Sequence, residues 1–239
     1  MTQLMNGDCL EEMKKIPDDS VDIILADLPY NIFKHLDWDK GISNFDEFWC
    51  QVWRVCKPNT PVFLFGNFKF ACELRMSQPK YFKYELVWNK CKSTSPLQSQ
   101  KRMGNATEYV CVFYKKPPVY NYKKYHKILK RENVYFNGSV VGGKQQKKQT
   151  NYYDPPLPLN VIECPPKMRG KLIKNITEKP QGILEKILRY HSNEGDTCLD
   201  MCMGSGSCGV ACHTLERKFI GIELNELHYQ IAKERLLNL

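Results

Sequence analysis

A glycine-rich turn between two apolar runs, near the C-terminal end of the chain, constrains the fold more than any other stretch. The first run begins at Thr197 and ends at Asp200, the turn follows as Met201-Cys202-Met203-Gly204-Ser205-Gly206, and a second run from Phe219 ends at Glu223. Two strands that each end in an acid, joined by a glycine turn and a helix, are typical of a nucleotide site in an α/β fold. Such a site usually opens its domain, so the preceding chain must supply the rest of the sheet.

The N-terminal part predicts two more strands that are each followed by an acid. Residues 1–8 end at Asp8 and precede apolar residues at helical spacing. Residues 21–26 are almost continuously apolar, as in a strand covered on both faces, and Asp27-Leu28-Pro29-Tyr30 follows them. Ligands of open α/β sheets bind at the carboxyl ends of strands. We therefore expect Asp8 and Asp27 beside the glycine turn.

The remaining periodic segments complete an α/β prediction. Apolar stripes predict helices at 45–56, 70–76, 181–191 and 229–237, and a buried strand at 61–65. The β-rich runs 84–88 and 108–114 predict an antiparallel hairpin. We predict a three-layer, doubly wound, mostly parallel sheet with an antiparallel edge hairpin.

The positive charge of the chain is concentrated in one segment that lacks this periodicity. Residues 115–179 contain 15 Lys+Arg against 4 Asp+Glu, whereas the remainder contains 20 against 22. Tyrosines lie among these cations, which favours a nucleic-acid-binding lobe over a merely solvated insertion. We expect catalytic-domain pieces at 1–116 and 171–239, and a basic insertion at 117–170. Its candidate DNA contacts are Lys123, Lys124, Lys127, Lys130, Arg131, Lys144, Lys147 and Lys148.

The cysteines and the hydropathy pattern bear on compartment and metal content. Eleven cysteines, with no signal peptide and no apolar run of membrane length, predict reduced thiols in a cytoplasmic chain without a membrane partner. Cys198, Cys202, Cys208 and Cys212, with His213 adjacent, raise the question of zinc. Their spacing fits no compact Cys-x2-Cys pair, so we expect buried core cysteines and no metal. A microbial, phage or viral source is left open.

Taken in order, the motifs resemble those of the β class of DNA amino-methyltransferases, which use S-adenosylmethionine (SAM). Asp27-Leu28-Pro29-Tyr30 comes first, Thr177-x-Lys179-Pro180 follows the basic segment, and the glycine turn comes last. The resemblance covers nearly the whole chain outside the basic segment. It implies a circularly permuted SAM-methyltransferase fold with a target-recognition lobe, which chain termini that meet in space allow. We expect the strands ending at Asp200, Glu223, Asp8 and Asp27 to follow one another across the sheet.

The resemblance also implies roles in cofactor binding. The glycine turn would wrap the methionine part of SAM, Glu223 would accept from both ribose hydroxyls, and Asp8 would accept from the adenine amine. Lys179, with Thr177, would face the cofactor's carboxylate. The blander alternatives are a simple turn at Asp8 and surface charges at Glu178 and Lys179. The expected cofactor residues are Asp8, Cys9, Asp27, Thr177, Lys179, Pro180, Asp200, Met201, Cys202, Gly204, Ser205, Gly206, Glu223 and Leu224.

The implied catalytic residues are Asp27, Leu28, Pro29 and Tyr30. An exocyclic amine is a poor nucleophile, and a carboxylate and a carbonyl accepting its two N–H groups would favour a lone pair aimed at the methyl group. Asp27 and the carbonyl of Leu28 are expected to do this, while Tyr30 stacks on a base flipped out of duplex DNA. Asp at the first motif position favours adenine-N6 by family regularity. Cytosine-N4 methylation, RNA methylation and a non-catalytic binding subunit are the alternatives.

The chain departs from the family pattern at two places. Leu28 stands where the family usually has a second proline, which removes a conformational constraint from the turn. Met201-Cys202 replaces the common Pro-Phe, which removes an aromatic wall beside the cofactor. We expect weaker cofactor binding as a result. A homodimer that embraces the duplex, and a place in a restriction–modification system, are further expectations taken from the family.

Overall fold

The computed structural model describes residues 1–30, 42, 44–93, 100–136, 146–166 and 178–239. The chain divides into two compact units. One comprises Met1–Val119 together with Asn160–Leu239, and the other is Tyr120–Leu159. The larger unit is thus built from both ends of the chain.

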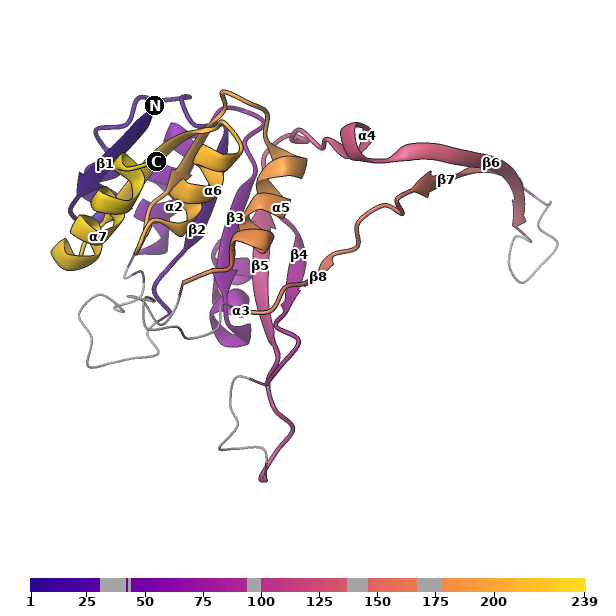
Figure 1. Cartoon of the computed structure of the whole chain (residues 1–239), viewed down its shortest axis with the longest axis horizontal. Helices are drawn as coiled ribbons and strands as arrows, with labels where there is room; N and C mark the ends of the chain where they lie inside the picture. The colour runs from indigo at the N-terminus through magenta and orange to yellow at the C-terminus, as the bar shows by residue number, and fades with distance from the viewer. Residues whose placement is uncertain (31–41, 43, 94–99, 137–145, 167–177) are drawn as a thin grey trace. The chain divides into compact units, whose positions relative to one another are not determined.

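An eight-stranded sheet forms the centre of the larger unit (Figure 1). Among the described strands of this sheet, β5 alone runs antiparallel to its neighbours, and the other pairs are parallel. The prediction of a mostly parallel sheet is confirmed. In spatial order the strands are β1 (Thr2–Asn6), β10 (Lys218–Glu223), β9 (Thr197–Asp200), β2 (Ile23–Asp27), β3 (Val62–Gly66), β5 (Thr107–Phe113), β4 (Phe82–Asn89) and β8 (Val161–Glu163).

The strand order corrects one expectation. β2 does not follow β1; it pairs with the other side of β9, with Ile23 opposite Cys198 and Ile24 opposite Leu199. The physical reason lies in burial, because β2 is buried along its first four residues and needs a neighbour on each side, whereas the largely exposed β1 suits an edge. Strand order therefore reverses at β9, and such reversals form the crevice in which α/β sheets bind ligands.

The predicted hairpin is confirmed as β4 and β5, but it does not form the edge of the sheet. β8 pairs in parallel with β4 and is the outermost strand on that side. This three-residue strand lies within the segment 117–170 that we assigned to the basic insertion. The single buried residue of β8, Ile162, packs in the core of the larger unit. One buried position produces no hydrophobic periodicity, so the sequence did not indicate this strand.

Helices cover both faces of the sheet, as predicted for a three-layer fold. Alternate residues of β2 point to opposite faces: Ile24 packs with the buried residues of α1 (Cys9–Met13), α2 (Phe45–Val55) and α3 (Phe68–Ser77). Leu25 packs instead with those of α5 (Gln181–His191), α6 (Ser207–Thr214) and α7 (Glu226–Leu237). Burial on both faces places the polar site residues at the strand ends, where the backbone leaves the sheet.

The two ends of the chain meet in this unit (Figure 1). β1 pairs with β10 in register from Thr2 opposite Phe219 to Asn6 opposite Glu223, and Phe219 N donates to Met1 O at 3.1 Å. The sheet is therefore continuous across the N- and C-terminal segments. This arrangement is the one that a circular permutation requires.

The smaller unit contains structure that the sequence did not predict. It holds the short helix α4 (Tyr122–Tyr125) and an antiparallel pair formed by β6 (Lys127–Phe136) and β7 (Gln146–Asp154). These strands lack a run of alternating apolar residues because they form a two-stranded sheet. Tyr122 packs against Tyr120 at 5.7 Å and against Tyr153 at 6.0 Å between ring centroids, which gives the unit an aromatic cluster of its own.

The thiol and membrane expectations can be compared with the structure. All eleven cysteines are free. Within the described ranges, no helix has both the length and the apolar character that crossing a membrane requires.

Candidate active site

Three acids meet at the carboxyl ends of adjacent strands. Glu223 ends β10, Asp200 ends β9 and Asp27 ends β2, and these strands are neighbours in that order. Asp8 follows β1, on the other side of β10, and is the N-cap of α1. The structure thus brings together the acids of both terminal segments, as the sequence predicted, although Asp27 arrives from the opposite side.

The glycine turn between β9 and α6 depends on two left-handed residues. Gly204 has φ +52° and Gly206 has φ +78°, a region in which side chains are strained. Gly206 is also the N-cap of α6, and a Cβ there would lie 3.0 Å from Leu236 Cδ1 of α7. Glycine at this position lets the turn pass closely over α7.

The Glu223 and Asp200 side chains bind the backbone of this turn through hydrogen bonds. Glu223 Oε2 accepts from Gly204 N at 2.9 Å, and Oε1 accepts from Asn225 N at 2.8 Å. Asp200 Oδ1 accepts from Cys202 N at 3.1 Å. The two side chains are only 7% and 5% exposed, and burial raises the pKa of Asp200 well above its ordinary value. Each carboxylate still has lone pairs for a further donor, since one oxygen can accept two hydrogen bonds.

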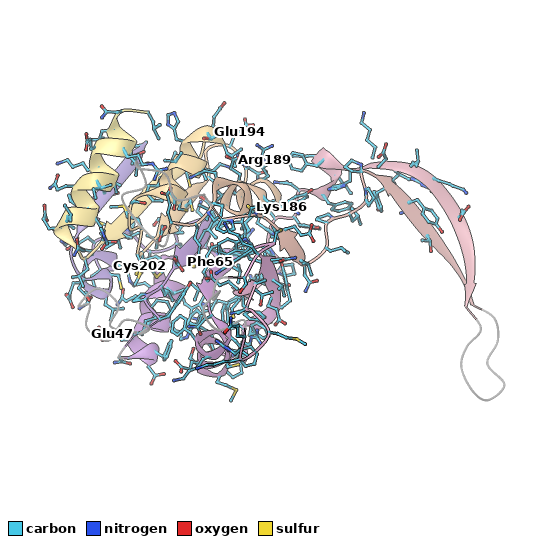
Figure 2. The ribbon with its side chains drawn as sticks, turned by 60° about the horizontal axis from the view of Figure 1, so that its bottom comes forward. Glu47, Phe65, Lys186, Arg189, Glu194 and Cys202 are labelled. Atoms are coloured by element: carbon cyan, nitrogen blue, oxygen red, sulfur yellow. The ribbon has the colours of Figure 1, made fainter. Side chains whose placement is uncertain are left out.

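The residues beside Glu223 that belong to neither the glycine turn nor β9 are more exposed to solvent. Asp8 Oδ1 caps α1 by accepting from Leu10 N at 2.9 Å, so its observed role is structural. Leu224 is 56% exposed and presents an apolar surface directly after Glu223. The Cys9 and Cys202 thiols form a hydrogen bond that lowers the pKa of Cys9 (Cys202 is labelled in Figure 2). The small Cys202 side chain is therefore packed against Cys9.

Asp27 lies at the centre of a polar cluster. The Tyr30 hydroxyl donates to Asp27 Oδ1 and the Lys179 ammonium donates to Oδ2. Burial raises the pKa of Asp27 despite these two partners. Leu28 is buried in the core, and the Tyr30 ring packs on Phe70 with centroids 5.2 Å apart. The motif thus presents one carboxylate and one aromatic ring from a firmly packed turn.

Lys179 enters the site from the residue before the N-cap of α5, Pro180. It is only 7% exposed, and its Nζ lies 5.2 Å from the ring centroid of Phe65 on β3, which Figure 2 labels. Burial acts to lower the pKa of Lys179, but the carboxylates of Asp27 and Glu108 outweigh it and raise the pKa. The buried cation is therefore held by two acids, and Glu108 was not among the predicted site residues.

A second ion pair connects α7 to the residue before Lys179. Arg235 of α7 donates to Glu178 at 2.9 Å and to the carbonyl of Ser205 in the glycine turn at 3.2 Å. The Glu178 side chain is 9% exposed, so the alternative of surface charges at Glu178 and Lys179 is wrong. Predicted residue Thr177 lies outside the described residues.

The predicted DNA contacts fall on the smaller unit. Lys123 and Lys124 lie on α4, and Lys127, Lys130 and Arg131 lie on β6; all five are exposed. Lys130 forms an ion pair with Glu132, which offsets part of its charge. Lys147 and Lys148 belong to β7, and Lys144 lies outside the described residues.

Three of the four cysteines that suggested zinc do come together. The sulfur atoms of Cys198, Cys208 and Cys212 all lie within 4.8 Å of one another, whereas Cys202 faces Cys9 and His213 is exposed. The three thiols are buried in the apolar cluster beneath the glycine turn. Burial in the core is confirmed, and the expected absence of a metal stays a prediction.

Comparison with known proteins identifies the class to which this fold and site belong. The sequence model of the N6/N4 DNA methylase family matches residues 21–234. DNA adenine methyltransferase YhdJ of Escherichia coli (strain K12) is 29% identical over 256 residues, which cover 98% of this chain and 82% of the relative. Type II methyltransferase M.HinfI of Haemophilus influenzae is 27% identical, covering 99% of this chain and 68% of that one.

Solved structures agree with this classification. The crystal structure of an M1.HpyAVI–SAM complex superposes with a TM-score of 0.67 at 26% identity, covering 99% of this chain and all of that chain. The cytosine-N4-specific PvuII DNA methyltransferase has a TM-score of 0.71 at 17% identity, covering 98% and 86%, and shows the shared fold. The chain belongs to the N6/N4 DNA methylase family. It is a SAM-dependent DNA methyltransferase.

The residues at the strand ends fit this cofactor. The left-handed Gly204 is only half-buried and adds no side chain to the turn, and Glu223 and Asp200 have acceptor capacity for hydroxyl and ammonium donors. The exposed Leu224 side chain follows Glu223 directly and adds an apolar surface beside these acids. The carboxylate acceptors and the apolar surface are therefore of the chemical types that SAM requires.

Proposed function

We propose that this enzyme methylates the N6 amine of an adenine flipped out of duplex DNA. The observation that carries the proposal is the position of Asp27, which ends β2 directly beside the glycine turn that follows β9. An acceptor for the target amine and the binding site for the methyl donor are thus brought to neighbouring strand ends. The resemblance of Asp27-Leu28-Pro29-Tyr30 to the family motif favours adenine.

In this proposal, Asp27 and the carbonyl of Leu28 accept the two N–H groups of the target amine. Two acceptors on fixed backbone orient the amine and raise electron density on its nitrogen, which is preorganised electrostatic catalysis. Tyr30, packed on Phe70, supports the base by stacking. When bound, SAM supplies the methyl group, activated by its positively charged sulfur.

Binding of the cofactor is assigned to the glycine turn and its acids. Glu223 and Asp8 would accept donors from the ribose and adenine parts, while Asp200, Met201 and Cys202 would line the methionine part. Glu223 is supported by its two oxygens at the turn, and Asp8 by its place after β1, next to β10. Cys9, Pro180 and Ser205 complete this set. The predicted contact of Lys179 with the cofactor's carboxylate also stays a proposal.

The smaller unit is proposed as the DNA-reading lobe. Five exposed cations on α4 and β6 supply phosphate contacts, and the exposed Tyr125 and Tyr152 offer rings for bases. The boundaries predicted for the lobe, 117–170, include β8, whose pairing with β4 favours a shorter lobe at Tyr120–Leu159. A homodimer that embraces the duplex is also proposed, on the resemblance to the family.

The proposal is tested by incubating wild-type enzyme with duplex DNA of mixed sequence and SAM carrying a labelled methyl group, then identifying the labelled nucleoside. We expect N6-methyladenine, and an Asp27→Ala control that binds SAM but transfers no methyl group. Label in N4-methylcytosine would replace the base assignment by the cytosine alternative. Label in RNA of equal length but not in duplex DNA would contradict the assigned substrate.

A further inference from the structure

Both oxygens of the Asp27 carboxylate are engaged in this structure. The Tyr30 hydroxyl donates to Oδ1, and the Lys179 ammonium donates to Oδ2. Under the proposed function, the same carboxylate must accept an N–H group from the target amine. The ammonium of Lys179 opposes this role, because it occupies an acceptor position and withdraws electron density from the carboxylate.

Glu108 offers Lys179 a second partner. Its Oε2 lies 3.7 Å from Lys179 Nζ, a distance that allows attraction but exceeds that of a hydrogen bond. Within the described part of the chain, this buried oxygen has no hydrogen-bond partner. A buried carboxylate oxygen without a donor is unfavourable, and a displacement of Lys179 by roughly one ångström would give this oxygen a hydrogen bond.

Strand pairing and a hydrogen bond hold Glu108 in place. It lies on β5, opposite Trp88 of β4, and its Oε1 accepts from Lys90 at 2.6 Å. Trp88 Nε1 in turn donates to the carbonyl of Cys164 at 2.7 Å. The carboxylate is therefore fixed on the sheet, with one oxygen held by Lys90 and the other directed towards Lys179.

We propose that Glu108 is a positioning residue that draws Lys179 away from Asp27 when the target base enters, so that the Asp27 carboxylate can accept from the target amine. Lys179 keeps one carboxylate partner throughout, and the buried site never holds an unpaired cation. The exchange needs no change in net charge: Asp27 and Glu108 balance Lys179 and Lys90 in both arrangements. The inference deepens the proposed function and rests on it.

Electrostatics supplies a signature that a purely structural role lacks. Burial raises the pKa of Asp27, and the negative charge of Glu108 raises it further, while Lys179 lowers it. Removing the charge of Glu108 leaves Lys179 to Asp27 alone. The loss of the negative charge of Glu108 and the undivided attraction of Lys179 both lower the pKa of Asp27. The pH at which Asp27 loses its proton should therefore fall.

The test compares Glu108→Gln, which keeps the size of the side chain and removes its charge, with Glu108→Asp and with the matched control Glu85→Gln, on the neighbouring strand β4, where Glu85 pairs with Arg75 and takes no part in the site. Single-turnover methyl transfer at saturating SAM is measured from pH 5 to 9, together with SAM affinity and urea unfolding. The Asp27 carboxyl of free enzyme is titrated by ¹³C NMR and assigned with Asp27→Asn. We expect Glu108→Gln to transfer methyl groups about 10–100-fold more slowly on the alkaline plateau, within the range of single catalytic contacts.

In the same variant, SAM affinity should change less than threefold, and both the acid limb of the rate and the Asp27 titration should move to lower pH. Glu108→Asp should recover part of the rate, and Glu85→Gln should retain the wild-type rate because Glu85 pairs with Arg75 and not with Lys179. An unchanged plateau rate, or a slower rate without movement of the acid limb and the carboxyl titration, would overturn the inference while wild-type activity upholds the proposed function. Wild-type enzyme without methyl transfer to any duplex DNA would overturn both.

Discussion

Replacing Gly206 by alanine should disturb the glycine turn through two separable effects. Its left-handed conformation costs an alanine about 1–2 kcal/mol. The added Cβ would also lie 3.0 Å from Leu236 Cδ1 and 3.3 Å from Ala232 Cβ, and crowding of this kind costs about 1–3 kcal/mol. We expect the free energy of unfolding, measured in urea, to fall by about 2–5 kcal/mol.

Gly195 provides the matched control. Its φ of +80° is nearly the same, but a Cβ there meets nothing within 4 Å. Gly195→Ala should therefore lose only the conformational part, about 1–2 kcal/mol, and should leave SAM affinity unchanged. Gly206→Ala should bind SAM at least tenfold more weakly because the turn moves. Equal destabilisation by the two substitutions would refute the crowding argument.

Three further predictions concern other parts of the sheet unit. Burial lowers the pKa of His191 to about 4, so folded protein resists its protonation and stability should be lost as pH falls below about 6.5. We expect about 2 kcal/mol less free energy of unfolding at pH 5 than at pH 8 from this group, and a weaker pH dependence in His191→Gln. Arg235→Ala leaves Glu178 buried without its cation and should cost about 1–3 kcal/mol, with weaker SAM binding in a titration. Cys202→Phe should strengthen SAM binding if the missing aromatic wall limits affinity, and equal affinity would count against that reason.

The elements of the fold were largely predictable because their signals are local. A continuous apolar run identifies β2, and a left-handed glycine turn before a helix identifies the end of β9. Strand adjacency is not local. The apolar sequence of β2 indicates its burial but not which strands lie beside it, so its pairing with β9 instead of β1 was not predicted.

The site was predictable only where a motif carries it. Asp27, Lys179, Asp200 and Glu223 stand in recognisable patterns. The structure brings the three acids to neighbouring strand ends, and the Lys179 side chain reaches Asp27 from the start of α5. Glu108 is a single acid in a strand of apolar residues, and its importance appears only when β5 places it 3.7 Å from Lys179. A charged residue acquires such a role from tertiary contacts, not from its sequence neighbours.

The hairpin of the smaller unit was missed for a different reason. β6 and β7 pair over nine registered residue pairs but show no alternating apolar pattern. The unit also packs tyrosines instead of aliphatic residues, with Tyr122 between Tyr120 and Tyr153. Its basic and polar composition therefore indicated a nucleic-acid lobe but not the structure of that lobe.

The central claim is that the N-terminal segment supplies the acceptor for the target amine and the C-terminal segment supplies the cofactor site. The most direct test is transfer of labelled methyl groups from SAM to duplex DNA by wild-type enzyme and Asp27→Asn, with SAM affinity measured for both. We predict labelled adenine with wild-type enzyme, and at least a hundredfold slower transfer with Asp27→Asn at nearly unchanged SAM affinity. Wild-type transfer rates in Asp27→Asn would contradict the assignment of Asp27 and with it the account of the site.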